Sequence, residues 1–235
     1  MASDVLVIVP ALDEEASLPR TIEEVRRVAP GVDLLVVDDG SRDGTSDAAR
    51  RVGVPVVRHA VNLGVGAALQ TGFRYAVERG YSIGVQLDAD GQHDPRFLEP
   101  LLQPVREGRS DVVIGSRYVA RTGYRAPIAR RLGMLVFSGV VRAVLGRRIS
   151  DTTSGFRAYG REVMRVCQHD FPRDFPDAPL LIDLVRRGFR CVEVAVEMRE
   201  REAGQSFYTL GKSLYYPYKN MLASLMVLLR RPAGR

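Results

Sequence analysis

Short apolar runs that alternate with helical patterns are the feature that most limits what this 235-residue chain can fold into. The run Val5–Val9 is apolar without alternation, which is typical of a strand buried on both faces of a parallel sheet. Apolar residues within 18–25 then recur at helical spacing, and a second apolar run follows at Leu34–Val37. This order favours βαβ units in an open, doubly wound, mostly parallel α/β sheet with helices on both faces.

The same rhythm continues to residue 116 and changes beyond it. The further elements predicted in the first half are helices at about Thr45–Val52, Leu69–Val77 and Arg96–Glu107 and strands at Val54–Val57, Ser82–Leu87 and Val112–Ser116. Those predicted in the second half are a helix over Leu180–Arg187, a strand over Cys191–Val196 and a basic amphipathic helix from about Lys212. Ligands of such sheets bind beyond the carboxyl ends of the strands, so residues that follow each strand are candidates for a site.

Composition excludes several classes of protein. With 46% hydrophobic and 26% charged residues the chain can bury a globular core, which rules out disorder, a collagen-like repeat and a disulfide scaffold. The two cysteines, Cys167 and Cys191, have no CxxC spacing, so we interpret them as core residues of a protein in a reducing compartment.

Positive charge is concentrated in one section of the chain. Thirty-four basic against twenty-eight acidic side chains leave a formal charge of +6, which favours a partner that carries phosphate: a nucleotide, a nucleic acid or an anionic membrane. From Arg117 to Arg148 there are eight arginines and no acidic residue, interleaved with apolar side chains. This pattern favours a helix on anionic lipid over a solvated basic face, and it is unlike a nucleic-acid recognition motif.

Neither a spanning helix nor a signal peptide is predicted. The longest apolar runs, Leu132–Val141 and Met221–Leu229, are shorter than the roughly 20 residues that cross a bilayer. No basic region precedes the run that begins at Val5, and acidic residues follow it within a few positions. We therefore expect a cytoplasmic protein, peripheral on the inner face of the membrane.

Acidic clusters follow three of the predicted strands. They are Pro10-Ala-Leu-Asp-Glu14, Asp38-Asp39-Gly40-Ser41 and Asp88-Ala89-Asp90-Gly91-Gln92-His93. Each cluster alone is ordinary turn chemistry, since Asp and Gly favour turns. Because the carboxyl ends of parallel strands meet at one edge of a sheet, we expect the three clusters to form one site.

The residue types in these clusters suit a nucleotide and a metal ion. Asp88 and Asp90, a DxD motif, with the amide oxygen of Gln92 offer hard oxygen ligands to Mg²⁺ or Mn²⁺ and leave positions open for a diphosphate. The pair Asp38-Asp39 is placed to accept hydrogen bonds from a nucleobase and a ribose, and Glu14 can do the same from the first loop.

The segment Asn62-Leu-Gly64-Val-Gly66 resembles a truncated dinucleotide fingerprint. It lacks the third glycine and follows the third strand, so a nicotinamide site is disfavoured. We interpret Asn62 as a helix cap instead.

The motifs, taken in order, resemble family 2 glycosyltransferases of GT-A fold, and within them the dolichol-phosphate mannose synthase branch of polyprenyl-phosphate glycosyltransferases. The residues that carry the resemblance are the three acidic clusters, Asn62-Leu-Gly64, Gly115-Ser-Arg117-Tyr, Ser154-Gly-Phe-Arg157 and Glu193-Val-x-Val. The resemblance covers nearly the whole chain. It implies a single GT-A domain over 1–235, with a nucleotide-sugar-binding half at 1–116 and an acceptor-binding half with interfacial helices at 117–235.

The resemblance also implies an activity and its residues. The activity is inverting, metal-dependent transfer of a hexose from a GDP- or UDP-sugar to a polyprenyl phosphate. Residues matched to the nucleotide are Pro10, Leu12, Glu14 and Asp38; those matched to the metal and diphosphate are Asp88, Ala89, Asp90 and Gln92; those matched to the acceptor phosphate and donor diphosphate are Arg117, Arg130 and Arg201. The predicted catalytic residues are Asp90 and these three arginines. Asp39 is also predicted to bind the nucleotide, from its position beside Asp38.

Two places depart from the family pattern. Leu12 and Asp13 stand where Tyr and Asn are usual, and Gly204-Gln-Ser206-Phe207 stands where Gly-x-Ser-Lys is expected. Lys212 is the candidate to replace the missing lysine at the acceptor phosphate.

The acceptor chemistry leaves alternatives open. A phosphate monoester is largely dianionic at pH 7 and needs no general base, whereas a hydroxyl acceptor does, with Asp183 or Asp177 as candidates. A non-catalytic nucleotide-sugar-binding partner of a membrane protein is a third possibility. A nucleotidyltransferase is disfavoured because no Gly-rich loop follows the first strand.

Overall fold

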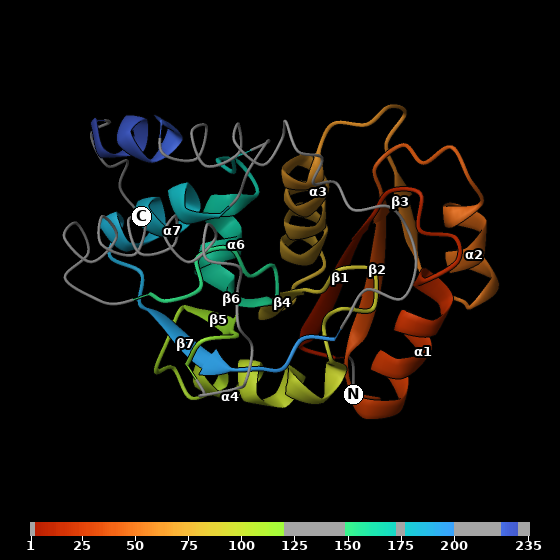
Figure 1. Ribbon diagram of the computed structural model, residues 1–235, viewed down its shortest axis with the longest axis horizontal. Coiled ribbons are helices and arrows are strands. Elements are labelled where there is room, and N and C mark those ends of the chain that lie inside the picture. Colours follow the sequence, from red (N-terminus) through yellow and green to blue (C-terminus); the bar gives the residue numbers. More distant parts are fainter. Residues whose placement is uncertain (1–2, 120–148, 173–176, 200–221, 230–235) are drawn as a thin grey trace.

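The computed structural model describes residues 3–119, 149–172, 177–199 and 222–229, which form one seven-stranded sheet with helices on both faces (Figure 1). In sheet order the strands are β3 (Val56–Arg58), β2 (Asp33–Asp38), β1 (Val5–Ala11), β4 (Ile83–Gln86), β6 (Arg157–Gly160), β5 (Val112–Ser116) and β7 (Cys191–Ala195). All neighbouring pairs are parallel except those that β6 makes with β4 and β5. The expected doubly wound, mostly parallel sheet is confirmed.

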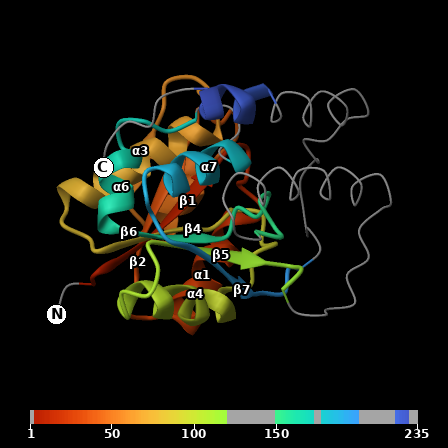
Figure 2. The same ribbon diagram turned by 90° about the vertical axis from the view of Figure 1, so that its left-hand side faces the viewer.

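The helices divide between the two faces of the sheet (Figure 2). Their bounds are α1 Leu18–Val28, α2 Thr45–Arg51, α3 Val65–Glu78, α4 Leu98–Arg106, α6 Arg161–Cys167 and α7 Ala178–Arg186, with a 3₁₀ turn, η1, at Pro95–Phe97 and a short helix at 222–229. Helices α3, α6 and α7 pack on one face, and α1, α2 and α4 on the other. Within the described residues no helix combines the length and apolar character needed to cross a bilayer.

Strand β1 shows why its sequence is apolar without alternation. Leu6 and Ile8 belong to the core beneath α3, while Val5, Val7 and Val9 belong to the core beneath α1. All five are almost fully buried, because a central strand of a parallel sheet has helices on both faces.

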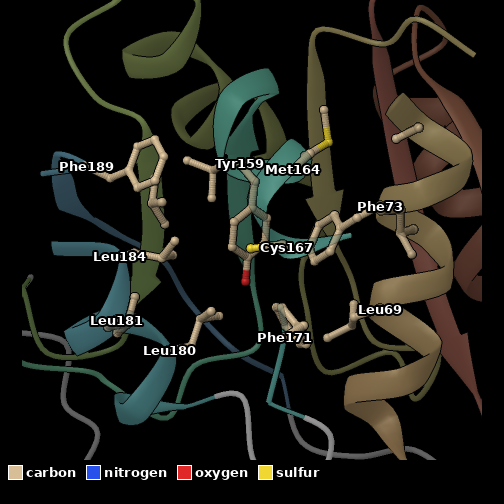
Figure 3. Close-up of a cluster of buried hydrophobic side chains, with 14 of the residues drawn as sticks. Leu69, Phe73, Tyr159, Met164, Cys167, Phe171, Leu180, Leu181, Leu184 and Phe189 are labelled. Carbon is tan, nitrogen blue, oxygen red and sulfur yellow. The ribbon is translucent and has the colours of Figure 1, made fainter. Parts of the chain in front are cut away.

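The core beneath α3, α6 and α7 joins the two halves of the chain (Figure 3). Phe73 of α3 contacts Tyr159 of β6 edge to face, with ring centroids 5.0 Å apart, and Phe171 at 5.4 Å. Cys167 and Cys191 are buried free thiols, as the sequence predicted.

The structure differs from the sequence prediction in three places, the first being helix α6, which was not predicted. Helix α3 begins at Val65 rather than Leu69, because Gly64 adopts a φ of 94° and ends the preceding loop there. Strand β6 was not predicted, since its four residues include Arg157 and end in Gly160.

Candidate functional site

The three acidic clusters lie together at one edge of the sheet, as predicted. Strands β2, β1 and β4 are neighbours and run parallel, with Ala11 opposite Asp38 and Ile8 opposite Gln86. The loops that follow them therefore leave the sheet at the same side. The first two loops are joined directly: the backbone N–H of Asp13 donates to Ser41 Oγ at 3.0 Å.

The DxD loop is built around a buried histidine. The backbone N–H of Asp88 donates to His93 Nδ1 at 3.0 Å, which leaves the ring proton on Nε2 when His93 is neutral. That nitrogen lies 3.6 Å from Asp88 Oδ2. The ring of His93 stacks on Phe156 with centroids 4.9 Å apart, so His93 shapes this loop from within the core.

Other contacts complete the loop. Asp90 Oδ1 accepts the backbone N–H of Gln92 at 3.0 Å, and Gly91 supplies a φ of 76° at the turn. From α1, the hydroxyl of Thr21 donates to the carbonyl of Ala89 at 3.1 Å. These bonds fix the two aspartates relative to each other.

The donor set suits a hard divalent cation. The side chain of Asp88 is 39% exposed, and a Cβ added at Gly155 would lie 3.0 Å from its Oδ2 and 2.9 Å from Gln86 Nε2. The glycine thus leaves the space beside the carboxylate open. Among the described residues no group of three or more His, Cys, Asp or Glu side chains gathers as a metal site. The roles of Asp88, Asp90 and Gln92 as metal ligands stay a prediction.

Asp38 is completely buried and fully hydrogen-bonded. It accepts the backbone N–H of Ser41 at 2.8 Å and the hydroxyl of Ser46, and Arg58 Nε lies 3.6 Å away. Burial alone raises the pKa of Asp38, but the hydrogen bonds from Ser41 and Ser46 and the charge of Arg58 hold the pKa below its usual value. Asp38 is therefore a carboxylate that orders the second loop, and its nucleotide role stays a prediction.

Asp39 holds the loop before α3. Its carboxylate accepts from the backbone N–H groups of Leu63 at 3.0 Å and Gly64 at 2.7 Å, and His59 Nδ1 lies 2.7 Å away. The prediction that Asn62 caps the helix is wrong: the N-cap is Gly64, and Asn62 Oδ1 only shares the N–H of Gly64 at 3.0 Å. The carboxylate of Asp39 thus accepts the backbone N–H groups before α3, a role that the sequence analysis gave to the side chain of Asn62.

The first loop contributes half-buried Pro10 and Leu12 and the buried Glu14. Glu14 Oε2 accepts the hydroxyl of Ser17 at 2.5 Å. Asp13, with a φ of 55°, accepts the backbone N–H of Arg42 at 2.7 Å. This strained position explains why a residue of the Asn/Asp type stands there.

On the acceptor side, Arg117 forms a two-pronged ion pair with Asp151. Its Nε and Nη2 each lie 2.7 Å from one carboxylate oxygen, and its backbone N–H donates to the same group at 3.1 Å. Burial raises the pKa of Asp151, yet Arg117 holds the pKa below its usual value, which makes Asp151 a poor general base. The predicted residues Arg130, Arg201 and Lys212 lie outside the described residues.

The two alternative general bases differ. Asp183 is half-buried and forms an ion pair with Arg187 at 2.6 Å, one turn further along the chain. Burial raises the pKa of Asp177 to about 7; the charges of Asp151 and Asp88 also raise it, while Arg157 lowers it. Asp177 is thus electrostatically coupled to the DxD loop.

Sequence reasoning missed the partners that come from distant parts of the chain. Residues of this kind are Thr21, His59 and Asp151. Arg117 and Asp151 are 34 positions apart, and no local spacing indicates such a pair. The only signal was Asp151-Thr-Thr-Ser, a turn-like sequence of the same kind as the second acidic cluster.

The sequence and the fold match known proteins. A protein-family model described as glycosyl transferase family 2 matches residues 6–167. An undecaprenyl-phosphate mannosyltransferase of Micrococcus luteus is 38% identical over 211 residues, which cover 86% of each chain. A polyprenol monophosphomannose synthase of Mycolicibacterium smegmatis is 39% identical over 212 residues, which cover 86% of this chain and 79% of the relative.

Among solved structures, glucosyl-3-phosphoglycerate synthase of Mycobacterium tuberculosis, in complex with Mn²⁺ and UDP-glucose, superposes with a TM-score of 0.69 at 25% identity. The match covers 94% of this chain and 77% of that one. The fold is GT-A and the protein is a glycosyltransferase. The chain belongs to glycosyl transferase family 2.

Proposed function

We propose that this protein transfers a sugar from a nucleotide-sugar donor to a polyprenyl phosphate, with inversion at the anomeric carbon. The observation that carries the proposal is the meeting of three acidic loops at one sheet edge, with the open carboxylate of Asp88 among them. The names of the relatives support the acceptor, since two of them act on undecaprenyl phosphate or a polyprenol.

The proposed donor is a GDP- or UDP-sugar, and the proposed cofactor is Mg²⁺ or Mn²⁺. Both metals take oxygen ligands of the kind that Asp88, Asp90 and Gln92 offer. When bound there, the ion neutralises charge that develops on the leaving diphosphate. The Mn²⁺ and UDP-glucose in the related synthase support a divalent ion and leave the choice of base and metal to experiment.

The chain's own residues then have separate tasks. The loops of Glu14 and Asp38 form the wall of the nucleotide site, and Arg117 lies beyond β5 at the acceptor side. An oxygen of the acceptor phosphate attacks the anomeric carbon as the bond from that carbon to the nucleoside diphosphate breaks. Because a phosphate monoester is largely dianionic at pH 7, no side chain has to remove a proton.

We also propose that the protein works on the cytoplasmic face of the membrane as a peripheral protein. Helix 222–229 supports this, since Val227 and Leu228 pack against the core while other apolar side chains on the helix are exposed. The exposed side chains recur at helical spacing and are Leu222, Leu225, Met226 and Leu229. Arg230 and Arg231 follow directly, so apolar and basic groups occur together, as lipid headgroups favour.

A second candidate function would use Asp177 as a general base. The raised pKa of Asp177, about 7, lies in the range of a general base, which a hydroxyl acceptor requires. In that case Asp177→Asn abolishes transfer while donor binding survives. With a phosphate acceptor the same variant keeps most of its activity.

Donor binding is the first test of the proposal. Thermal shifts are measured with GDP, UDP and dTDP and their sugars, with and without Mn²⁺ or Mg²⁺. We expect a metal-dependent rise in Tm for one nucleotide, lost in Asp90→Asn and kept in Asp47→Asn, a control whose carboxylate is 70% exposed on α2. No response to any nucleotide in wild type contradicts the proposed donor site.

A further inference from the structure

The carboxylate of Glu193 on β7 binds a turn that belongs to another part of the chain. Its oxygens accept the backbone N–H groups of Ser150 and Asp151, both at 2.8 Å, and the hydroxyl of Ser150 at 2.9 Å. Glu193 lies opposite Ile114 in the β5–β7 pair, two positions before β5 ends at Ser116. The side chain therefore holds the turn directly beside the end of β5.

The turn formed by Ser150 and Asp151 also holds Arg117. Asp151 has no exposed side-chain surface and binds the guanidinium of Arg117 through both oxygens at 2.7 Å. The hydroxyls of Ser116 and Ser150 lie 3.2 Å apart, which joins the end of β5 to the turn a second time. Glu193, the turn and Arg117 thus form a relay across three separate stretches of chain.

We propose that Glu193 is a positioning residue of the acceptor site: it orders the Ser150–Asp151 turn, and Asp151 thereby sets the direction of the Arg117 guanidinium toward the acceptor's phosphate. The proposal rests on the proposed function for the identity of the acceptor. Bidentate pairing fixes the plane of a guanidinium as well as its position, so a small shift of Asp151 turns the whole group.

The alternative explanation is that Glu193 only holds strands β5 and β7 together. A second carboxylate, Asp111, offers a control for that explanation. At the other end of the same two strands, Asp111 of the β5 side accepts the backbone N–H of Arg190 at 2.7 Å and its Nε at 3.1 Å. Asp111 also joins the β5 side to the β7 side by several hydrogen bonds, at the end of the two strands opposite to Arg117. If Glu193 only holds the strands together, substitution of Glu193 and substitution of Asp111 should have equal effects on KM.

The decisive comparison is Glu193→Gln against Asp111→Asn. Glutamine keeps the shape of Glu193, but its amide nitrogen accepts nothing, so one backbone N–H of the turn loses its acceptor. We expect Glu193→Gln to raise KM for undecaprenyl phosphate about tenfold while kcat changes less than about threefold and Mn²⁺–nucleotide affinity stays at the wild-type value. Asp111→Asn is expected to leave KM unchanged, although it lowers Tm by about as much as Glu193→Gln does. Equal KM values in the two variants overturn the proposal.

A double-mutant cycle tests whether the effect passes through Arg117. If it does, Arg117→Lys and Glu193→Gln together raise KM no further than Arg117→Lys alone. If the double variant instead raises KM by the product of the two single effects, the relay is overturned.

An NMR measurement separates this inference from the proposed function. The ¹H–¹⁵Nε signal of Arg117 is assigned by its loss in Arg117→Lys and compared in Glu193→Gln and Asp111→Asn. A shift or broadening in Glu193→Gln alone supports the relay, even where wild type transfers nothing to polyprenyl phosphate and the proposed function fails. An unchanged signal in Glu193→Gln overturns the relay whatever the acceptor is.

Discussion

The buried carboxylate of Asp39, in the half proposed to bind the donor (residues 3–116), binds backbone amides, whereas that of Asp151, in the half proposed to bind the acceptor, binds an arginine. Asp39 accepts from the N–H groups of Leu63 and Gly64, while Asp151 accepts both prongs of the Arg117 guanidinium. An amide donor is fixed by the fold itself, but a guanidinium carries a charge and five donors that a ligand can also use. Under the proposed function, this difference suggests that loop geometry shapes the donor site around Asp39 and that a charged pair shapes the acceptor site around Arg117.

The largest effect on stability is expected when the ion pair between Asp151 and Arg117 loses one partner. Asp151→Ala leaves the Arg117 guanidinium, only 14% exposed, without its carboxylate, and we expect a loss of about 3 kcal/mol in the free energy of unfolding. Asp39→Ala removes amide and imidazole contacts and should cost about 1–2 kcal/mol. Urea unfolding of both variants measures the difference. A larger loss for Asp39→Ala would break the comparison between the halves.

Gly155 tests where the two halves meet. A methyl group there would lie 3.0 Å from Asp88 Oδ2 and 2.9 Å from Gln86 Nε2, so Gly155→Ala must shift the Gln86 amide and press on the carboxylate proposed to bind the metal. We expect Mn²⁺-dependent nucleotide affinity to fall about tenfold, or about 1.4 kcal/mol, by calorimetry. Gly31→Ala is the matched control, because nothing lies within 4 Å of its added Cβ. Unchanged affinity in Gly155→Ala would show that the acceptor half does not shape the DxD loop.

A smaller effect, dependent on pH, is expected at Asp177. Its folded pKa of about 7 lies above the usual value of 3.8, so the stability due to its neutral form is full below pH 3.8 and is lost as pH rises through 7. Asp177→Asn keeps the side chain neutral and should be more stable than wild type at pH 8, by roughly 1 kcal/mol for a half-buried group. The gain should vanish near pH 4. Urea unfolding in EDTA at the two pH values measures it, and a gain independent of pH would contradict the raised pKa.

The smallest effect is expected at Asn62. Because Asp39 already accepts the N–H of Gly64 at 2.7 Å, Asn62→Ala should cost less than about 0.5 kcal/mol. Thermal unfolding beside Asp39→Ala provides the measurement. A loss of about 1 kcal/mol, as for a true N-cap, would restore the interpretation made from sequence.

The sequence predicted the donor half well because its signals are local. Unbroken apolar runs identified β1 and β2, and the parallel arrangement then placed the loops of Asp38 and Asp88 at one edge. The acceptor half depends on contacts between distant positions, such as Ser150 with Glu193, 43 residues apart. Strand β6 escaped prediction because Arg157 breaks its apolar pattern. In the folded protein Arg157 is tolerated in the core because it donates to the carbonyl of Thr152 at 2.7 Å.

Transfer to a lipid phosphate tests the central claim most directly. Purified protein is incubated with Mn²⁺, a GDP- or UDP-sugar chosen by donor binding, and either undecaprenyl phosphate or undecaprenol, which differ only in the phosphate group. The predicted result is a lipid-linked sugar from undecaprenyl phosphate alone, lost in Asp90→Asn and retained in Asp177→Asn. Equal transfer to undecaprenol, or no lipid-linked product from a donor that binds, would contradict the proposed function.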